Sequence, residues 1–314
     1  MDGGAGASAR PVYNLFMEVA KKINPKYISM IMPSRWFAGG KGLDLFRENM
    51  LKDRRISHLF DFINAKECFP TASIGGGINY FLWESNYDGG CYITNIQGGK
   101  RDTELRRLDQ FPILIRYNSA TRIIQKCGSE RTFDEIVNTR NSFGLSSNIR
   151  GERFGDLRLI SSEGISWLPR NAVSNSNSLV EKYKILISKV TAEHAGEPDK
   201  NGQFRIISRM EIISPFDVCT DSYLIIGASE DRLIVENEYK YICTRFARFL
   251  LMLSVSSINL SPDKFKLIPL QDFTADSDID WSQSVAEIDR QLYRKYGLDE
   301  KEIAFIEEKV RAME

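Results

Sequence analysis

The chain has 314 residues, of which 42% are hydrophobic and 11% aromatic, which is enough for buried cores and excludes global disorder. Its net charge is zero, so total charge gives no sign of a nucleic-acid partner. The longest apolar run, 246–255, is too short to cross a bilayer, and residues 1–20 contain no secretion signal. We therefore expect a cytoplasmic chain of more than one domain, without a membrane partner.

The charges are distributed unevenly along the chain. Residues 100–170 contain thirteen basic and nine acidic residues, whereas residues 272–314 contain six basic and twelve acidic ones. The acidic tail thus cancels basic charge located elsewhere, and local fields decide binding. An unevenly charged solvated surface explains the same counts. The five cysteines form no CxxC pair, which is typical of reduced thiols and supports neither a zinc site nor a disulfide framework.

The first third of the chain has the pattern of an α/β sheet. Helical spacing predicts a helix over 12–23, ended by Asn24-Pro25, and a short apolar run predicts a strand over 27–32. A second amphipathic helix is expected at 43–53 and a buried strand at 56–62. The runs 78–84 and 91–96 are expected to pair as a hairpin. This order is that of the back half of a doubly wound sheet, with an antiparallel strand at its end.

After Gly98-Gly99 the pattern becomes irregular, and we place a domain boundary at residue 99. Short strands are expected at 157–161, 204–213 and 223–228, with a helix–strand unit at 178–190 and a long amphipathic helix at 238–255. Mixed short elements with long polar loops are typical of a recognition domain, because loops on a scaffold carry function. We expect this α+β part to span 100–271, and a tail of two helices, broken at Gly297 and capped at Asp299, to span 272–314.

The glycine-rich turns do not have the context of a cofactor site. A doubly wound domain binds its nucleotide-like cofactor where the first strand turns into a helix. The glycines at 3–6 precede any predicted strand, and those at 75–77 precede a strand and not a helix. Neither group is expected to form a phosphate-binding loop.

Two stretches of the chain resemble the adenine-N6 DNA methyltransferases of Type II restriction–modification systems, including those fused to a nuclease. Residues 2–96 contain the more specific matches, DGGAGASARPVYNLFMEVA, IMPSRWFAGGKGLDLFRENML and ECFPTASIGGGINYFLW. Residues 238–310 contain RFARFLLMLSV, KFKLIPLQDF and LYRKYGLDEKEIAFIE, which are similar to the family's closing segment. The middle third matches weakly, as expected of the part that decides which DNA sequence is bound.

The resemblance implies that this chain is the C-terminal part of such an enzyme. In the family, an Asn-Pro-Pro-Tyr motif and the S-adenosylmethionine turn lie upstream of the glycine-rich segment that opens this chain. Neither motif occurs here, and Asn24-Pro25-Lys26-Tyr27 is interpreted as a turn. We therefore expect a fragment that supplies DNA recognition and is inactive in methyl transfer alone. The intact protein would use S-adenosylmethionine, and this chain is not expected to bind it tightly.

The resemblance places an aromatic residue that stacks on the flipped adenine at Phe69. A base that leaves the duplex loses stacking energy, and an aromatic face restores part of it. Pro70, Ile74 and the glycines Gly75, Gly76 and Gly77 would shape the wall beside it, since glycines let the backbone approach a nucleotide. The alternatives are a core aromatic at Phe69 and a simple tight turn at the glycines.

Polar residues in loops are candidates for contacts with double-stranded DNA. Ser34, Arg35 and Lys41 follow the strand at 27–32, at the edge where α/β sheets bind ligands, and could meet phosphates. Arginine and asparagine can each bind a purine edge, and serine can bind phosphate. Further candidates for contacts with DNA cluster in the loops 139–154 and 189–209. They are Arg140, Asn141, Ser142, Asn148, Arg150, Arg153, Lys189, His194 and Arg209. Exposed solvated loops would have the same composition.

Two other interpretations remain open at this point. The chain could be a stand-alone specificity subunit, in which residues 1–99 dock on a separate catalytic chain. It could also be an α/β protein without a nucleic-acid role. Salt-dependent binding to duplex DNA separates this last possibility from the others, because phosphate contacts release counterions.

Overall fold

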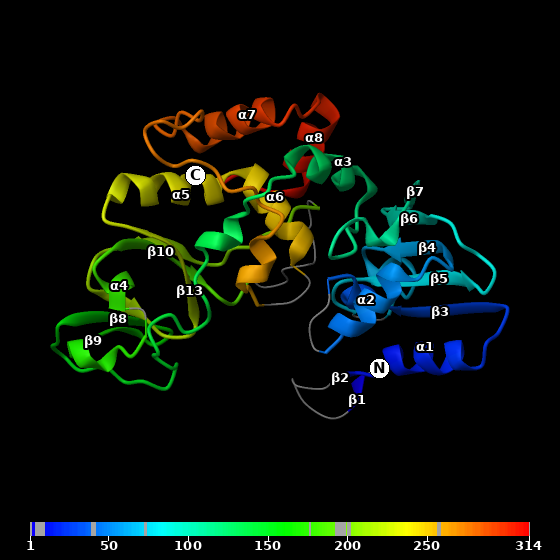
Figure 1. The fold of residues 1–314 in the computed structure, drawn as a ribbon, viewed down its shortest axis with the longest axis horizontal. Coiled ribbons are helices and arrows are strands. Elements are labelled where there is room, and N and C mark those ends of the chain that lie inside the picture. The colour runs from blue at the N-terminus through cyan, green and yellow to red at the C-terminus, as the bar shows by residue number, and fades with distance from the viewer. Residues whose placement is uncertain are drawn as a thin grey trace. The chain divides into compact units, whose positions relative to one another are not determined.

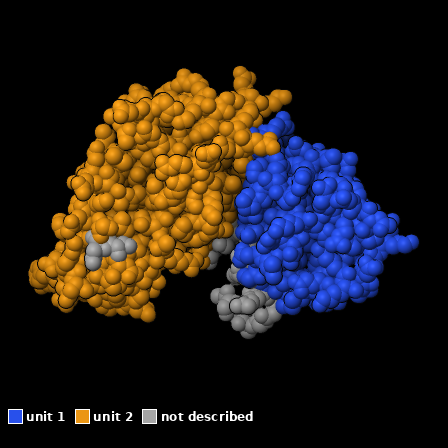
Figure 2. Space-filling model, viewed as in Figure 1, with its two compact units in different colours: residues 1–122 blue, residues 123–314 orange. Residues whose placement is uncertain are grey.

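The structure is a computed structural model that describes residues 2–3, 10–38, 42–71, 74–175, 177–191, 199, 202–255 and 259–313 (Figure 1). The fold is mixed α/β, and the chain divides into two compact units, residues 1–122 and 123–314 (Figure 2). In the described part of the chain, no helix is long and apolar enough to cross a membrane.

The first unit consists of one main sheet with helices on one face. Its elements, in chain order, are β1 (Asp2–Gly3), β2 (Arg10–Pro11), α1 (Tyr13–Lys22), β3 (Tyr27–Pro33), the 3-10 turn η1 (Ser34–Phe37), α2 (Asp44–Lys52), β4 (Ile56–Phe62), η2 (Ala65–Glu67), β5 (Ile78–Glu84), β6 (Cys91–Gln97), β7 (Lys100–Arg106), η3 (Leu108–Gln110) and α3 (Asn118–Cys127), which spans the boundary at residue 122. The predicted helices at 12–23 and 43–53 and the strands at 27–32 and 56–62 are confirmed. Asn24 adopts φ 54°, as the predicted turn after α1 requires.

The sheet has the order β3-β5-β4-β6-β7. Strand β5 runs antiparallel to both β3 and β4, so β3 and β4 are parallel to each other with β5 between them. The predicted hairpin between 78–84 and 91–96 is therefore wrong, because β5 pairs with β3 and β4 while β6 pairs in parallel with β4. Local alternation fixes which residues form a strand, but it does not fix which neighbour the strand pairs with.

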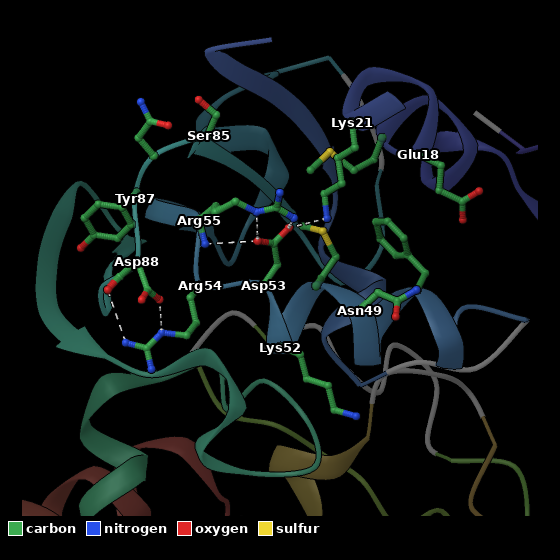
Figure 3. Close-up of a pocket in the computed structure, with 14 residues that line it drawn as sticks. Glu18, Lys21, Asn49, Lys52, Asp53, Arg54, Arg55, Ser85, Tyr87 and Asp88 are labelled. Atoms are coloured by element: carbon green, nitrogen blue, oxygen red, sulfur yellow. Dashed lines mark hydrogen bonds and ion pairs between the residues drawn. The ribbon is translucent and has the colours of Figure 1, made fainter. Parts of the chain in front are cut away.

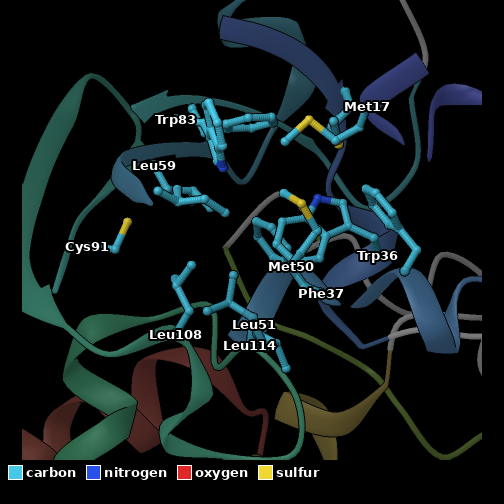
Figure 4. Packing of buried hydrophobic residues seen from close by; sticks show 14 of the residues in the cluster. Met17, Trp36, Phe37, Met50, Leu51, Leu59, Trp83, Cys91, Leu108 and Leu114 are labelled. Carbon is cyan, nitrogen blue, oxygen red and sulfur yellow. The ribbon is translucent and has the colours of Figure 1, made fainter. Parts of the chain in front are cut away.

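One face of this sheet packs on the first unit's hydrophobic core (Figure 4). Met17 of α1 and Met50 of α2 lie against Phe81 and Trp83 of β5, and all four side chains are buried. Alternate residues of each strand face this core, as the period of two requires. The β3 residues Ile28 and Met32 point inward, whereas Tyr27 and Ile31 are exposed.

Asp53 lies at the end of α2, and its side chain links this helix to α1 and β5 (Figure 3). Its carboxylate lies 2.6 Å from Lys21 Nζ and accepts hydrogen bonds from Arg55 Nε at 2.7 Å and Trp83 Nε1 at 2.9 Å. Burial raises the pKa of Asp53, but these partners lower it by more, so it lies well below its usual range. The pocket of about 760 Å³ beside it is lined by apolar and charged residues, and several of the charged ones are paired, such as Arg54 with Asp88.

The predicted boundary at residue 99 differs from the observed unit boundary. Gly98 and Gly99 adopt φ of 58° and 72° in the turn between β6 and β7, which pair along their whole length. The turn glycines therefore mark a hairpin inside the first unit and not a linker, and the unit continues to Arg122.

The second unit contains two three-stranded sheets, ordered β11-β10-β13 and β12-β8-β9. Its elements are η4 (Phe133–Ile136), β8 (Leu157–Ser161), β9 (Gly164–Leu168), η5 (Arg170–Ala172), α4 (Asn177–Val180), β10 (Tyr183–Ser188), β11 (Met210–Ile213), β12 (Asp217–Cys219), β13 (Tyr223–Ser229), α5 (Arg232–Cys243), α6 (Arg245–Ser254), η6 (Pro262–Phe265), α7 (Val285–Lys295) and α8 (Glu300–Lys309). The residues 272–314 belong to this unit, because α7 and α8 pack on α5 and α6.

The predicted long helix at 238–255 is two helices. Thr244 has the extended angles φ −64° and ψ 150°, and its hydroxyl accepts a hydrogen bond from the Ala247 N–H as the N-cap of α6. The helix is therefore interrupted although its apolar pattern continues. The predicted break at Gly297 and the capping box of Asp299 with Glu302 are confirmed. The predicted strand at 204–213 is shorter, since β11 begins at Met210.

Glu238 is a buried acid on α5. It is 6% exposed, and within the described residues its Oε2 has no hydrogen-bond partner. It packs against Gly227 of β13, where a side chain would overlap the carboxylate. Burial raises the pKa of Glu238 to about 7.

We predict that Glu238 makes the second unit less stable as the pH rises. The folded protein retains the Glu238 proton up to about pH 7, whereas the unfolded chain loses it near pH 4. The free energy of unfolding should therefore fall between these values by up to about 3 kcal/mol. In Glu238→Gln this fall should disappear, as measured by urea unfolding at pH 5 and pH 8. The same fall in the variant as in the wild type would contradict the assignment.

Candidate functional site

The carboxyl ends of β3 and β4 lie at the same edge of the first unit's sheet, because the two strands are parallel. Ser34 follows β3 directly, and Asp61 is the penultimate residue of β4. Both are buried, and Ser34 Oγ donates a hydrogen bond to Asp61 Oδ1 at 2.8 Å. A polar pair thus closes the end of the core at this edge, which we call the strand-end edge.

Arg116 joins Ser34 and Asp61 at this edge, because it forms a buried ion pair with Asp61. Its Nε and Nη2 donate to the two Asp61 carboxylate oxygens at 2.5 and 2.8 Å, and Nη2 also donates to the Phe62 carbonyl at 3.3 Å. The side chains of Asp61 and Arg116 are 1% and 17% exposed. Burial lowers the pKa of Arg116, but the Asp61 carboxylate raises it by more, so the guanidinium remains charged. A bidentate pair of this kind fixes orientation as well as position.

Asn79 of β5 extends the same network. Its Nδ2 donates to the Met32 carbonyl at 3.1 Å and to Ser34 Oγ at 3.3 Å. Its Oδ1 is buried and, among the described residues, has no hydrogen-bond partner. The ends of β3, β4 and β5 are therefore joined through side chains as well as through the sheet.

The glycine turn at 75–77 packs against this network. The Gly77 carbonyl accepts a hydrogen bond from the Ser34 N–H at 3.0 Å. Gly77 has φ +77°, and a Cβ there would overlap Arg116 Nη2 and the Phe62 carbonyl. Gly76 has φ +82°, but a Cβ there would meet nothing within 4 Å. Of Gly76 and Gly77, both named from the sequence as part of the wall beside Phe69, Gly77 is therefore the position where a side chain cannot fit.

Phe69 and Pro70 lie on the loop between β4 and β5, and both are exposed. The Phe69 ring is 41% exposed, so it is not the core aromatic of the alternative interpretation. The loop is held by the Phe69 N–H, which donates to the Ala65 carbonyl at 2.8 Å, and by Glu67, whose carboxylate accepts the Gly98 and Gly99 N–H groups at 3.0 Å. An exposed ring on an anchored loop beside the strand-end edge can stack on a flat ligand.

The other candidates in the first unit have different positions. Ser34 is 3% exposed and bonded to Asp61, so its hydroxyl is part of the protein's own network and not a surface group that could meet a phosphate. Arg35 is half-buried in η1. Lys41 lies outside the described residues.

In the second unit, the structure gathers several candidates from both predicted loops at one end of the domain. Arg209 Nη1 donates to the Tyr223 hydroxyl at 3.1 Å, and that hydroxyl donates to the Ser161 carbonyl at the tip of the β8–β9 hairpin. Lys189 Nζ donates to the Asp221 carbonyl at 3.2 Å. At the same hairpin, Arg150 pairs with Glu163 at 2.7 Å. We call this region the hairpin-tip surface.

The remaining candidates of the second unit are divided between exposed and structural positions. Arg140, Asn148 and Arg153 are exposed, and Arg153 lies 5.6 Å from the Phe154 ring centre. Asn141 has φ 59° in a turn, and Ser142 is buried with its hydroxyl donating to the Thr139 carbonyl, so Ser142 has a structural role. His194 lies outside the described residues.

The residues described do not form a cofactor or metal site. No three of the described His, Cys, Asp and Glu side chains gather to hold a metal ion. S-adenosylmethionine would need an acid at a strand end to bind the ribose. Asp61 is at such a strand end, but Arg116 and Ser34 already occupy its oxygens. Asp61 is therefore not available to bind the ribose of this cofactor.

Sequence reasoning missed Asp61, Asn79 and Arg116. An acid inside the predicted buried strand 56–62 is a usable signal, because an acid is rarely fully buried unless it is paired. Arg116 is 55 residues away in the chain from its partner, and nothing in its local sequence indicates the pairing.

We predict that Gly77→Ala destabilises the first unit by at least about 2 kcal/mol, because the new Cβ overlaps the backbone and displaces Arg116. Gly76→Ala is the matched control: it has the same sign of φ but open space, so it should cost about 1 kcal/mol. Urea unfolding measures both. Equal costs for the two variants would show that the Arg116 contact does not constrain the turn.

Comparison with known proteins finds similar sequences. Residues 2–69 match the family model described as Eco57I restriction-modification methylase. A protein of Mycoplasma pneumoniae (strain ATCC 29342 / M129 / Subtype 1), described as an uncharacterized adenine-specific methylase, is 33% identical over 146 residues. The match covers 46% of this chain and 34% of that protein, so the chain spans about a third of the relative's length.

Two solved structures show a weaker likeness. The type IIG restriction endonuclease BpuSI is 11% identical with a TM-score of 0.35, and the match covers 98% of this chain and 50% of that one. The Type IIL restriction-modification enzyme MmeI, solved in complex with DNA, is 8% identical with a TM-score of 0.46, covering 89% and 49%. Neither score reaches 0.5, so these two likenesses carry no argument. The sequence matches show that residues 2–69 are similar to the Eco57I restriction-modification methylase model, and that the chain is similar over 146 residues to a protein described as an adenine-specific methylase.

Proposed function

We propose that this chain supplies DNA recognition and one wall of the adenine pocket of a DNA adenine-N6 methyltransferase in a restriction–modification system. The observation that carries the proposal is the position of Phe69. It ends the segment that matches the methylase family, and its exposed ring is held on a short loop at the strand-end edge. Ligands of α/β sheets bind at the carboxyl ends of the strands, which is where this ring lies.

Phe69 acts in this proposal as a stacking platform for an adenine that has left the duplex. The network of Asp61, Arg116 and Ser34 keeps the glycine turn in place behind it. The platform needs no proton transfer and no metal, only a flat apolar face in a fixed position. Methyl transfer itself would use S-adenosylmethionine in the intact enzyme, and the residues of this chain contribute binding and orientation of the base.

The second unit is proposed to contact the DNA duplex through exposed cations. Arg140 and Arg153 are exposed and, among the described residues, neither forms an ion pair with a carboxylate. At the hairpin-tip surface, Arg150 and Arg209 pair with Glu163 and Glu211. Exposed ion pairs of this kind contribute little stability, so a phosphate can replace the carboxylate at little cost.

We predict that the chain binds duplex DNA with an affinity that falls steeply as salt increases, as measured by fluorescence anisotropy. Arg140→Ala should weaken binding by about tenfold and reduce the salt slope by about one if the arginine contacts phosphate. Arg232→Ala is the control, because Arg232 is also exposed but pairs with Glu236 on the surface of α5. Absence of binding at low salt would contradict the DNA-recognition proposal.

A second prediction addresses Phe69. A duplex whose adenine faces an abasic position presents a base that leaves the stack at low cost. The chain should bind this duplex more tightly than the fully paired one. In Phe69→Ala the ratio of the two affinities should fall by about tenfold. Leu233→Ala, at an exposed leucine on α5, should leave it unchanged. If the preference survives in Phe69→Ala, the ring does not stack on the base.

A further inference from the structure

The turn between β6 and β7 lies at the strand-end edge. Strand β6 runs parallel to β4, so its carboxyl end lies at the same edge as Asp61. The sheet order places β6 and β7 next to β4, on the side away from β3, as Figure 1 shows. The β6–β7 turn is therefore a neighbour of the loop that leaves β4 and carries Phe69.

Glu67 ties this turn to the Phe69 loop. Its two carboxylate oxygens accept the Gly98 and Gly99 N–H groups, each at 3.0 Å. Both glycines have positive φ, 58° and 72°, which is the conformation of a tight two-residue hairpin turn. Because Glu67 already binds both N–H groups, an anion at this turn would be bound by side chains.

Two basic side chains follow the turn at the start of β7. Lys100 and Arg101 are exposed, and within the described part of the chain neither forms an ion pair with a carboxylate. Just beyond the other end of β7, by contrast, Arg107 pairs with Asp109 at 2.7 Å. The turn thus presents two positive charges that the described residues leave unpaired.

We propose that Lys100 and Arg101 bind a DNA phosphate next to the adenine that stacks on Phe69. The inference rests on the proposed function and adds a phosphate-binding element to the same site. A nucleotide that leaves the duplex brings its flanking phosphates with it. Lysine and arginine bind phosphate oxygens strongly, and such contacts fix the position of the strand without depending on its sequence.

The shared anchor favours a phosphate close to this adenine over a distant one. Glu67 binds the turn and lies two residues before Phe69, whose N–H donates to the Ala65 carbonyl at 2.8 Å. The aromatic face and the two cations are therefore held by one short segment. A nucleotide carries its base and its phosphates on one sugar, so a site that binds both needs the stacking face and the cations at a fixed separation.

The test uses the full chain and a short duplex in which one adenine faces an abasic position. In two further duplexes, the phosphate on one or the other side of that adenine is replaced by an uncharged methylphosphonate. Fluorescence anisotropy should show that one replacement weakens binding by the wild type about tenfold. The double variant Lys100→Ala/Arg101→Ala should bind the unmodified duplex about tenfold more weakly, with a salt slope smaller by about one. The same replacement should then have no further effect.

Lys26→Ala is the matched control. Lys26 is also an exposed lysine without a carboxylate partner among the described residues, but it directly precedes β3 and so lies at the opposite edge of the sheet. This variant should bind every duplex as the wild type does. Because all three side chains are exposed, the unfolding midpoint of each variant serves as the check of folding.

A methylphosphonate effect that is as large in the double variant as in the wild type would overturn the inference. An equal loss of binding in Lys26→Ala would also overturn it, because the effect would then be one of total charge. The proposed function fails separately. A wild-type chain that binds no duplex contradicts both proposals, whereas a double variant that binds all the duplexes as the wild type does leaves the function intact and overturns only the phosphate contact.

Discussion

The buried ion pair between Asp61 and Arg116 is the interaction on which the candidate site depends. A carboxylate that is 1% exposed is tolerated only because Arg116 binds both of its oxygens and Ser34 donates to one of them. The same guanidinium packs on Gly77, so the turn beside the edge has no room for a side chain. Removal of either Asp61 or Arg116 would leave the other as a buried, unpaired charge. The loop that carries Phe69 follows directly after β4, the strand that contains Asp61.

The strand-end edge holds the neighbouring loop in position and offers no reactive group of its own. Its charged groups are satisfied by one another, and the exposed feature beside it is an aromatic ring. This arrangement suits a surface that receives a base, because stacking requires a fixed flat face and no titrating group.

The outer strands of the first unit's sheet differ in charge, since β7 has five charged residues out of seven and β3 has none. An uncharged open edge with apolar side chains on both faces is a hazard for aggregation unless a partner covers it. The charged β7 edge prevents extension of the sheet on the other side. The two edges of this sheet therefore differ in their tendency to pair with another strand.

Most of the elements of the fold could be predicted from the sequence, because apolar periodicity is local. The pattern predicted α1, α2, β3, β4, β8, β13 and the capped tail helices, whereas the base-stacking role that the resemblance gave to Phe69 stays a prediction. Tertiary structure decided the rest. Strand β5 lies between β3 and β4 and does not form a hairpin with β6, since pairing depends on which edges are free when the chain collapses. Arg116 finds Asp61 across 55 residues, and Ser34 turns inward to meet it, because a buried carboxylate must be neutralised wherever a partner can reach. Local pattern indicates which residues are buried, but only the packed chain decides which groups they meet.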